Sequence, residues 1–156
     1  VRDSKELSES TREELFEIIR EQALAISVIE ISAAQVDERG VHAANLEGMR
    51  RAVQRLTMIP NYVLTDGYVI AGLGLPTLAL WKGDQVVNTI SAASIIAKVT
   101  RDRLMREFDT QYPGYGFARH KGYITVAHTA ALEEYGPCLI HRRSFSNVTA
   151  LINTDK

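Results

Sequence analysis

The sequence has little cysteine, few aromatic residues and no long apolar run. The single cysteine, Cys138, excludes an internal disulfide and a zinc site built from cysteines. No apolar run approaches the roughly 18 residues needed to cross a membrane, and no apolar signal segment follows Val1. The 156 residues are 46% hydrophobic and 7% aromatic, enough for a packed core. We therefore predict a globular, cytoplasmic protein with no membrane partner.

The charge is nearly balanced over the whole chain but uneven along it. The formal net charge is −1. Residues 98–143 contain eight lysines and arginines against five aspartates and glutamates, a net charge of +3, together with three histidines. A basic C-terminal third is compatible with a face that binds phosphates. It is equally compatible with a solvated helix surface, so charge alone selects neither interpretation.

Predicted helices and strands alternate along the chain. The spacing of apolar residues predicts helices over residues 10–23, 33–38, 45–56, 88–108 and 126–135. Ser10 and Glu13 fit a capping box at the start of the first helix. Strands are predicted over residues 25–31, 62–65 and 77–81. This succession favours an α/β fold in which helices flank a sheet.

Two aspartates follow predicted strands. Asp66 ends the strand over 62–65 and precedes Gly67, whereas Asp84 follows Gly83 just beyond the strand over 77–81. Ligand sites in open α/β sheets gather at strand ends, and converging carboxylates are hard oxygen ligands for Mg²⁺ or Mn²⁺. Asp-Gly is also a common turn pair, so each aspartate alone has a structural interpretation of equal weight.

The long predicted helix carries two stripes of residues. Its apolar stripe is predicted to be Ile90, Ala93, Ala97, Leu104 and Phe108, with the stem of Arg101. A second stripe at spacings of four, three and four contains Ser91, Ile95, Lys98 and Asp102. Lys98 and Asp102 could form a surface ion pair. Alternatively, Asp102 faces a metal and Lys98 faces a phosphate.

A nine-residue segment interleaves aromatic, basic and glycine residues. Residues 115–123 contain three aromatic side chains, Tyr115, Phe117 and Tyr123, among three basic ones. This mixture suits stacking on a base or sugar beside phosphates, and it also suits plain packing. Residues 141–144 add a phosphate contact or a solvated surface. The sequence contains no Gly-rich phosphate loop, no paired-histidine zinc spacing and no Gly-x-Ser-x-Gly elbow.

Several segments together resemble one enzyme family. In chain order they are residues 3–8, 45–53, 62–67, 82–84, 91–103, 112–117, 120–123 and 136–145. They resemble bacterial ribonuclease HII, the type 2 ribonuclease H, and in particular its actinobacterial members. The resemblance implies a ribonuclease H-like α/β fold, a central mixed sheet flanked by helices. It places an α/β core at residues 1–110, a small C-terminal helical region for the substrate junction at 111–148, and a tail at 149–156.

The resemblance also implies an activity and a site. The family's endonucleases hydrolyse the RNA strand of RNA–DNA hybrids and cut 5′ of single ribonucleotides in duplex DNA, leaving a 3′-hydroxyl and a 5′-phosphate. Four carboxylates, in the order Asp, Glu, Asp, Asp, hold two cations, Mn²⁺ or Mg²⁺. Asp66 resembles the third, Asp84 the fourth, and Asp102 a further acidic residue near the second metal; Tyr123 resembles the tyrosine that stacks on the deoxyribose after the ribonucleotide. The other implied substrate-binding residues are Lys5, Asn45, Ser91 and Lys121; no protein partner is implied.

The sequence departs from the family pattern at its beginning. The family's first Asp and Glu lie in a Gly-x-Asp-Glu-x-Gly-Arg-Gly segment before an Asp-Ser-Lys motif, which here begins at Asp3. We therefore expect an N-terminally incomplete member, without the opening strands, that binds metal weakly and cleaves poorly. Glu6 stands where many members carry a second lysine. Two alternatives remain: a phosphatase-like hydrolase with an aspartate nucleophile, and a non-catalytic nucleic-acid-binding fragment.

Overall fold

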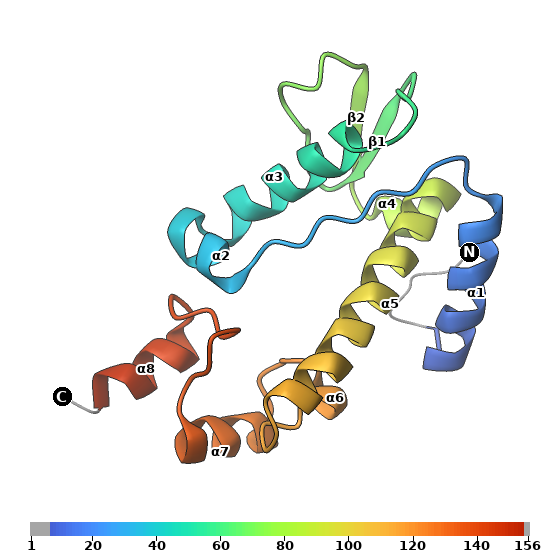
Figure 1. Ribbon diagram of the computed structural model, residues 1–156. Helices are drawn as coiled ribbons and strands as arrows, with labels where there is room; N and C mark the ends of the chain where they lie inside the picture. The colour runs from blue at the N-terminus through green and yellow to red at the C-terminus, as the bar shows by residue number, and fades with distance from the viewer. Residues whose placement is uncertain (1–6, 155–156) are drawn as a thin grey trace. The chain divides into compact units, whose positions relative to one another are not determined.

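The chain forms two compact units, each built from two separate stretches of sequence. The computed structural model describes residues 7–154 (Figure 1). Within that range the first unit contains residues 7–30 and 45–100, and the second contains residues 31–44 and 101–154. Among the described residues, no helix combines the length and the hydropathy that a membrane crossing requires. Each unit is described in turn below.

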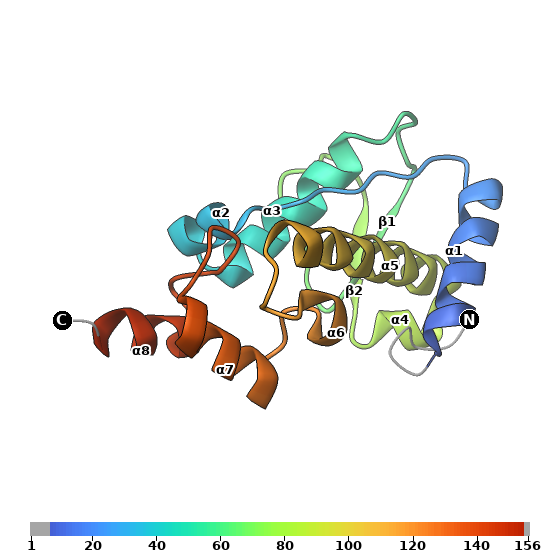
Figure 2. The ribbon, with the colours of Figure 1, turned by 60° about the horizontal axis from the view of Figure 1, so that its bottom comes forward.

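Helix α1, Glu9–Gln22, packs against the first half of helix α5, Asn88–Gln111 (Figure 2). The N-cap of α1 is Ser8, whose hydroxyl accepts a hydrogen bond from the Thr11 N–H. The predicted capping box at Ser10 is therefore wrong by two residues. Phe16 of α1 is buried and packs in one cluster with the buried residues Ile95, Ile96 and Val99 of α5.

The buried face of α5 is the second of the two predicted stripes. Ser91 and Ile95 are 1% and 0% exposed, whereas Ala93 and Ala97 of the predicted apolar stripe are exposed. The prediction is wrong for these two alanines and correct for Ile90, which is 7% exposed, because isoleucine and valine side chains remove far more apolar area from water than alanine does. The helix therefore turns its larger side chains inward, and the polar Ser91 is carried into the interior with them.

The strand predicted over residues 25–31 is absent from the described structure. This segment runs without a ladder between α1 and helix α2, Ala33–Arg39 (Figure 1). Burial still alternates from one residue to the next between residues 25 and 32. The period-2 pattern is thus real, but among residues 7–154 no strand pairs with it. Helix α2 is confirmed, with a capping box formed by Ser32 and Gln35 and an end at Gly40, where φ is 80°.

Two parallel strands follow helix α3, Val41–Gln54, which begins four residues before its predicted start. Strand β1, Val63–Asp66, pairs with β2, Thr77–Leu80, in a register that places Asp66 opposite Leu80. On β1, Val63 and Thr65 are buried, whereas the intervening side chains are exposed. The predicted α/β class is confirmed, and the described residues supply two strands of the sheet.

The second unit is helical. Besides helix α2 and the first residues of α3, it contains the end of α5 and three further helices: α6, Phe117–His120; α7, Val126–Tyr135; and α8, Ser146–Thr154. Helix α7 matches its predicted bounds. Helix α8 begins within the predicted helical region, 111–148, and continues into residues 149–154, where only a tail is predicted. The core of this unit consists of Met105, Tyr115, Phe117, Ala131, Leu132 and Val148.

Within the second unit, one carboxylate ties helix α2 to the segment that precedes α8. Asp37 accepts hydrogen bonds from the Arg143 N–H at 2.8 Å, from the Ser144 N–H at 2.9 Å and from the Ser144 hydroxyl at 2.6 Å. The Ser144 hydroxyl contributes most to a lowered pKa of Asp37. Three donors thus converge on one side chain from a segment more than a hundred residues away, at |i−j| of 106 and 107.

Candidate functional site

Asp66 and Asp84 are linked through Gly83, the residue directly before Asp84. Asp66 is the exposed last residue of β1, and its Oδ1 accepts a hydrogen bond from the Gly83 N–H at 2.9 Å. Asp84 follows directly, in the short helix α4, Gly83–Val86, and is 8% exposed. The predicted convergence of the two strand ends is therefore present in the backbone: β1 ends where the chain leaving β2 turns into α4.

Gly83 makes this close approach possible. A Cβ at this position would lie 2.6 Å from Cδ1 of Ile90 and 3.2 Å from Cβ of Leu80. Lys82, just before it, adopts a left-handed conformation with φ of 53°. The chain thus turns sharply after β2, and a residue without a side chain lets α4 pack against the sheet. This packing holds the Gly83 N–H against Asp66.

The carboxylates suit a hard cation in kind but are too few in number. Their oxygens are the ligand type that Mg²⁺ and Mn²⁺ prefer. However, within residues 7–154 no three His, Cys, Asp or Glu side chains gather closely enough to hold a metal ion. The described residues alone therefore do not form a two-cation centre.

The remaining predicted site residues occupy different environments. Asp102, in the second unit, is 4% exposed, so its carboxylate does not lie on a solvated surface. Ser91 lies in the first unit at 1% exposure. Asn45 is exposed on α3, and Lys5 lies outside the described residues.

The segment over residues 115–123 divides between core and surface. Tyr115 and Phe117 are 7% and 1% exposed, and their rings stack with centroids 5.2 Å apart. Plain packing is therefore the correct interpretation for these two rings. Tyr123 differs, because 62% of it is exposed. Lys121 turns its ammonium group back to the Ala118 carbonyl at 2.5 Å.

The backbone of Tyr123 is held at both ends although its ring faces solvent. Its N–H donates to the His120 carbonyl at 2.9 Å. Its carbonyl lies 3.0 Å from Nδ1 of His128, on the first turn of α7. The Thr125 hydroxyl caps α7 by accepting from the His128 N–H at 3.1 Å. An exposed aromatic ring thus stands on a fixed turn.

Three buried histidines surround Phe117 in the second unit. His120, His128 and His141 are 9%, 4% and 7% exposed, and their ring centroids lie 5.5 to 5.9 Å from that of Phe117. Burial lowers the pKa of His128 and of His141, and it raises the pKa of the neighbouring Cys138 thiol. Burial therefore favours the neutral forms of His128, His141 and Cys138. Because His141 is buried, neither interpretation considered for it, a phosphate contact or a solvated surface, is correct.

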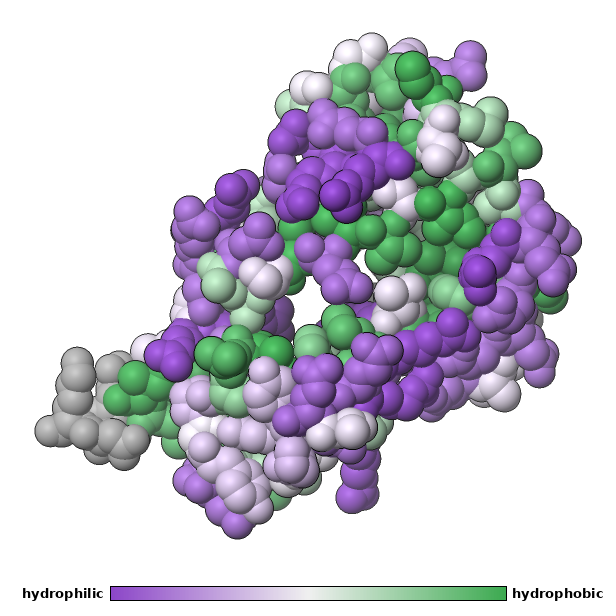
Figure 3. Space-filling view, viewed as in Figure 1, coloured by the Kyte–Doolittle hydropathy of each residue, from purple (hydrophilic) through white to green (hydrophobic). Residues whose placement is uncertain are grey.

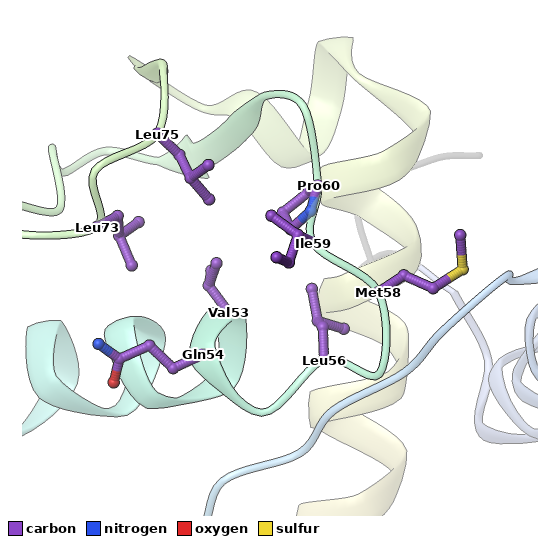
Figure 4. A pocket seen from close by; sticks show the side chains of 8 residues that line it. All are labelled: Val53, Gln54, Leu56, Met58, Ile59, Pro60, Leu73 and Leu75. Atoms are coloured by element: carbon purple, nitrogen blue, oxygen red, sulfur yellow. The ribbon is translucent and has the colours of Figure 1, made fainter.

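An apolar hollow in the first unit is unsuited to phosphate chemistry. It lies between the end of α3 and the loops that flank the strands (Figure 4). No carboxylate, imidazole or cationic group is among its lining residues, Val53, Gln54, Leu56, Met58, Ile59, Pro60, Leu73 and Leu75. Hydrophobic surface also lies on the upper part of this unit in Figure 3. Among the large apolar side chains of this unit, Ile59 and Val69 are 85% and 65% exposed.

The sequence-based prediction missed two features, the hydrogen bond from Gly83 to Asp66 and the histidine cluster. A glycine directly before a candidate carboxylate, after a strand, is the available signal for the first. For the second, the signal is three histidines and the single cysteine within residues 120–141 of a chain that contains four histidines in all. Their mutual contacts join residues 13 positions apart, so spacing alone could not show them.

The comparisons with known proteins identify the family and the fold. The family model described as Ribonuclease HII matches residues 1–148. The chain is 59% identical over 146 residues to Ribonuclease HII of Mycobacterium ulcerans, covering 94% of this chain and 61% of that relative. The chain thus spans about three fifths of the length of this curated relative.

Two solved structures share the fold. The ribonuclease H2 of Pyrococcus horikoshii matches with a TM-score of 0.82 and 26% identity, over 97% of this chain and 80% of that one. A complex of PCNA and RNase HII from Archaeoglobus fulgidus matches with a TM-score of 0.73 and 25% identity, over 92% and 77%. The fold is therefore that of a ribonuclease H-like protein. The chain belongs to the Ribonuclease HII family.

Proposed function

We propose that the chain is part of an endoribonuclease that hydrolyses the RNA strand of RNA–DNA hybrids and cuts 5′ of single ribonucleotides in duplex DNA. The products would carry a 3′-hydroxyl and a 5′-phosphate. The observation that carries this proposal is the family match over residues 1–148, together with Asp66 and Asp84 joined through the Gly83 N–H at one strand end. The proposed place of action is the cytoplasm.

In this proposal Asp66, Asp84 and Asp102 are the catalytic carboxylates of a centre that takes Mn²⁺ or Mg²⁺. Two divalent cations would activate a water molecule and stabilise the leaving 3′-oxygen. The family resemblance implies two more carboxylates, in a Gly-x-Asp-Glu segment that this sequence does not contain. We propose that these 156 residues alone bind divalent cations weakly and cleave poorly, because clustered carboxylates need both cations and a full ligand set.

The second unit supplies the proposed contact with the substrate. Tyr123 is suited to stacking on a sugar because its ring is 62% exposed and its backbone is fixed. Lys121, two residues before it, would add positive charge. Asn45, which is exposed, would contact the nucleic acid elsewhere, as would Lys5, which lies outside the described residues. The burial of Ser91 at 1% exposure favours a supporting position over a direct contact.

Cleavage of an end-labelled DNA duplex with one ribonucleotide tests the proposal. The 156-residue chain is assayed in Mn²⁺ and in Mg²⁺, beside a version extended by the family's Gly-x-Asp-Glu segment. We expect the extended protein to cut 5′ of the ribonucleotide and to leave an all-DNA duplex intact. Failure of the extended protein to cut under either metal would overturn the proposal.

The second candidate function is binding without cleavage by these 156 residues. The observation that favours it is the absence, among the described side chains, of any three metal-ligating groups gathered together. It predicts that the 156-residue chain prefers a ribonucleotide-containing duplex over all-DNA in fluorescence anisotropy, while neither metal produces a cut. Efficient cleavage by the unextended chain would exclude this candidate.

A further inference from the structure

Two buried histidines, His128 and His141, connect Cys138 to Tyr123 through a continuous series of hydrogen bonds, which we call the histidine relay. Nδ1 of His141 lies 3.0 Å from the Cys138 backbone N–H. Nε2 of His141 lies 3.2 Å from Nε2 of His128. Nδ1 of His128 lies 3.0 Å from the Tyr123 carbonyl. Four residues from two segments are thus linked in series beneath the exposed tyrosine ring.

The two backbone groups at the ends of the relay, the Cys138 N–H and the Tyr123 carbonyl, determine which imidazole nitrogens carry protons. The Cys138 N–H can only donate, so Nδ1 of His141 accepts and its single proton lies on Nε2. That proton is donated to Nε2 of His128, so the proton of His128 lies on Nδ1. It is donated in turn to the Tyr123 carbonyl, which can only accept. One arrangement of neutral tautomers therefore satisfies every link.

His120 supports the same turn separately. Its Nδ1 accepts from the Gly122 N–H at 3.2 Å, so its Nε2–H donates to the Tyr115 carbonyl at 2.7 Å. Its ring stacks on that of His128, with centroids 4.4 Å apart and planes 16° from parallel. The titratable groups that face the relay are His120, Cys138 and Tyr115. Each imidazole nitrogen is thus engaged, and none is left to hold a cation.

We propose that the relay from Cys138 through His141 and His128 is a positioning device that fixes Tyr123 for reading a ribonucleotide junction. His128 and His141 are positioning residues, because they act on the substrate only through the Tyr123 backbone. The inference rests on the proposed function for the role of Tyr123. The Nδ1–H of the buried His128 fixes the Tyr123 carbonyl, while the ring of Tyr123 remains in solvent.

Paired amide substitutions test the relay, because asparagine and glutamine imitate different imidazole nitrogens. Asparagine places an amide near Nδ1, whereas glutamine places one near Nε2. At position 128 the bond to Tyr123 needs Nδ1, so His128→Asn should retain function better than His128→Gln. At position 141 the bond to His128 needs Nε2, so His141→Gln should retain function better than His141→Asn.

The readout is the preference for a ribonucleotide-containing duplex over an all-DNA duplex, measured by fluorescence anisotropy without cleavage. We expect His128→Gln and His141→Asn to lose about three- to tenfold of this preference, as for one hydrogen bond. His42→Gln, at an exposed histidine of α3, is the matched control and should retain it. A packing role alone favours the larger glutamine at both positions, so retention by His128→Gln above His128→Asn would overturn the proposal.

Nitrogen-15 spectra of the wild-type imidazoles provide a test that needs no variant. We expect protonation at Nδ1 of His128 and at Nε2 of His141. The opposite tautomer at His128 would overturn the relay even if the variants fail to fold. Wild-type protein without any ribonucleotide preference would overturn the proposed role of Tyr123, and the inference would fall with it, whereas the proposed cleavage activity is tested separately with the extended protein. Preference in the wild type that all four variants retain would overturn only the inference.

Discussion

The two candidate regions are built on opposite principles. The strand end of the first unit presents an exposed carboxylate, Asp66, held by one backbone N–H. The histidine cluster of the second unit is buried, and its ring nitrogens are paired with one another or with the backbone. Charge is accessible in the first region and excluded from the second.

The contrast distinguishes a region suited to binding a cation from a region that holds another residue in place. A carboxylate that binds a cation must stay ionised and reachable, so it cannot be satisfied by its own protein. A scaffold that fixes a ring must be fully satisfied, because an unpaired buried polar group costs about 1–3 kcal/mol. Asp66 is accordingly exposed to solvent, whereas His128 is buried and both of its ring nitrogens are hydrogen-bonded. The variants below test this division, from the largest expected effect to the smallest.

Asp66→Asn should have the largest effect and act on activity alone. The amide oxygen can still accept from the Gly83 N–H, so stability should be retained, whereas an anionic metal ligand is lost. We expect cleavage by the extended protein to fall by more than the roughly 10–100-fold typical of outer-shell partners of a metal. Initial rates on the ribonucleotide-containing duplex measure the change. Glu38→Gln, at an exposed carboxylate of α2, is the control; an equal loss there would refute the assignment.

Gly83→Ala should destabilise the turn that supports Asp66. The new Cβ would meet Cδ1 of Ile90 at 2.6 Å, and overpacking of this kind costs about 1–3 kcal/mol. Urea unfolding measures the loss. Ile90→Val removes Cδ1, so the double variant should recover part of the stability through a favourable coupling. Strictly additive losses in the two variants would show that the crowding is not at Ile90.

Acid should weaken the second region through its histidines. Burial lowers the pKa of His128 and His141 below the ordinary value of 6.5, so below that pH the unfolded chain binds protons that the folded chain does not. Stability should be level above about pH 6.5 and fall as pH decreases, by at most about 1.4 kcal/mol per pH unit for each histidine.

Thermal unfolding between pH 7.5 and pH 5.5 gives this slope. His141→Gln carries one fewer titrating imidazole and should show a shallower dependence. A wild-type midpoint that rises on acidification would contradict the sign of the lowered pKa values.

Tyr115→Phe should have the smallest effect, about 1 kcal/mol, because it removes one hydrogen bond to the Gly136 carbonyl at 2.6 Å. Guanidinium unfolding measures it. Tyr135→Phe is the comparison, since Tyr135 is 51% exposed and water can replace the hydrogen bonds that its hydroxyl makes. Equal losses in the two variants would mean that burial of Tyr115 adds nothing.

The sequence allowed prediction of what depends on local pattern. The helices α2 and α7, the strands β1 and β2 and the two strand-end aspartates follow from periodicity and from turn residues. The strand over residues 25–31 failed because a strand needs a partner, and its own alternation cannot supply one. Likewise the inward face of α5 depends on what packs against it.

The histidine relay was beyond prediction for a different reason. Each of its links joins two residues in one specific tautomer, and spacing along the chain contains no information on ring orientation. The exposed ring of Tyr123 and the buried ring of Tyr115 come from one nine-residue segment. Only the fold distinguishes them, because both have the same side chain and similar neighbours in sequence.

The three hydrogen bonds at Asp37 have a consequence for the order of folding during synthesis. Asp37 leaves the ribosome 107 residues before Ser144, an interval of about 5–20 s at ordinary translation rates. Helix α2 must therefore wait, already synthesised, while the intervening residues of the first unit are made. The newborn chain begins its second unit before its first is complete and can close that unit only near the end of translation.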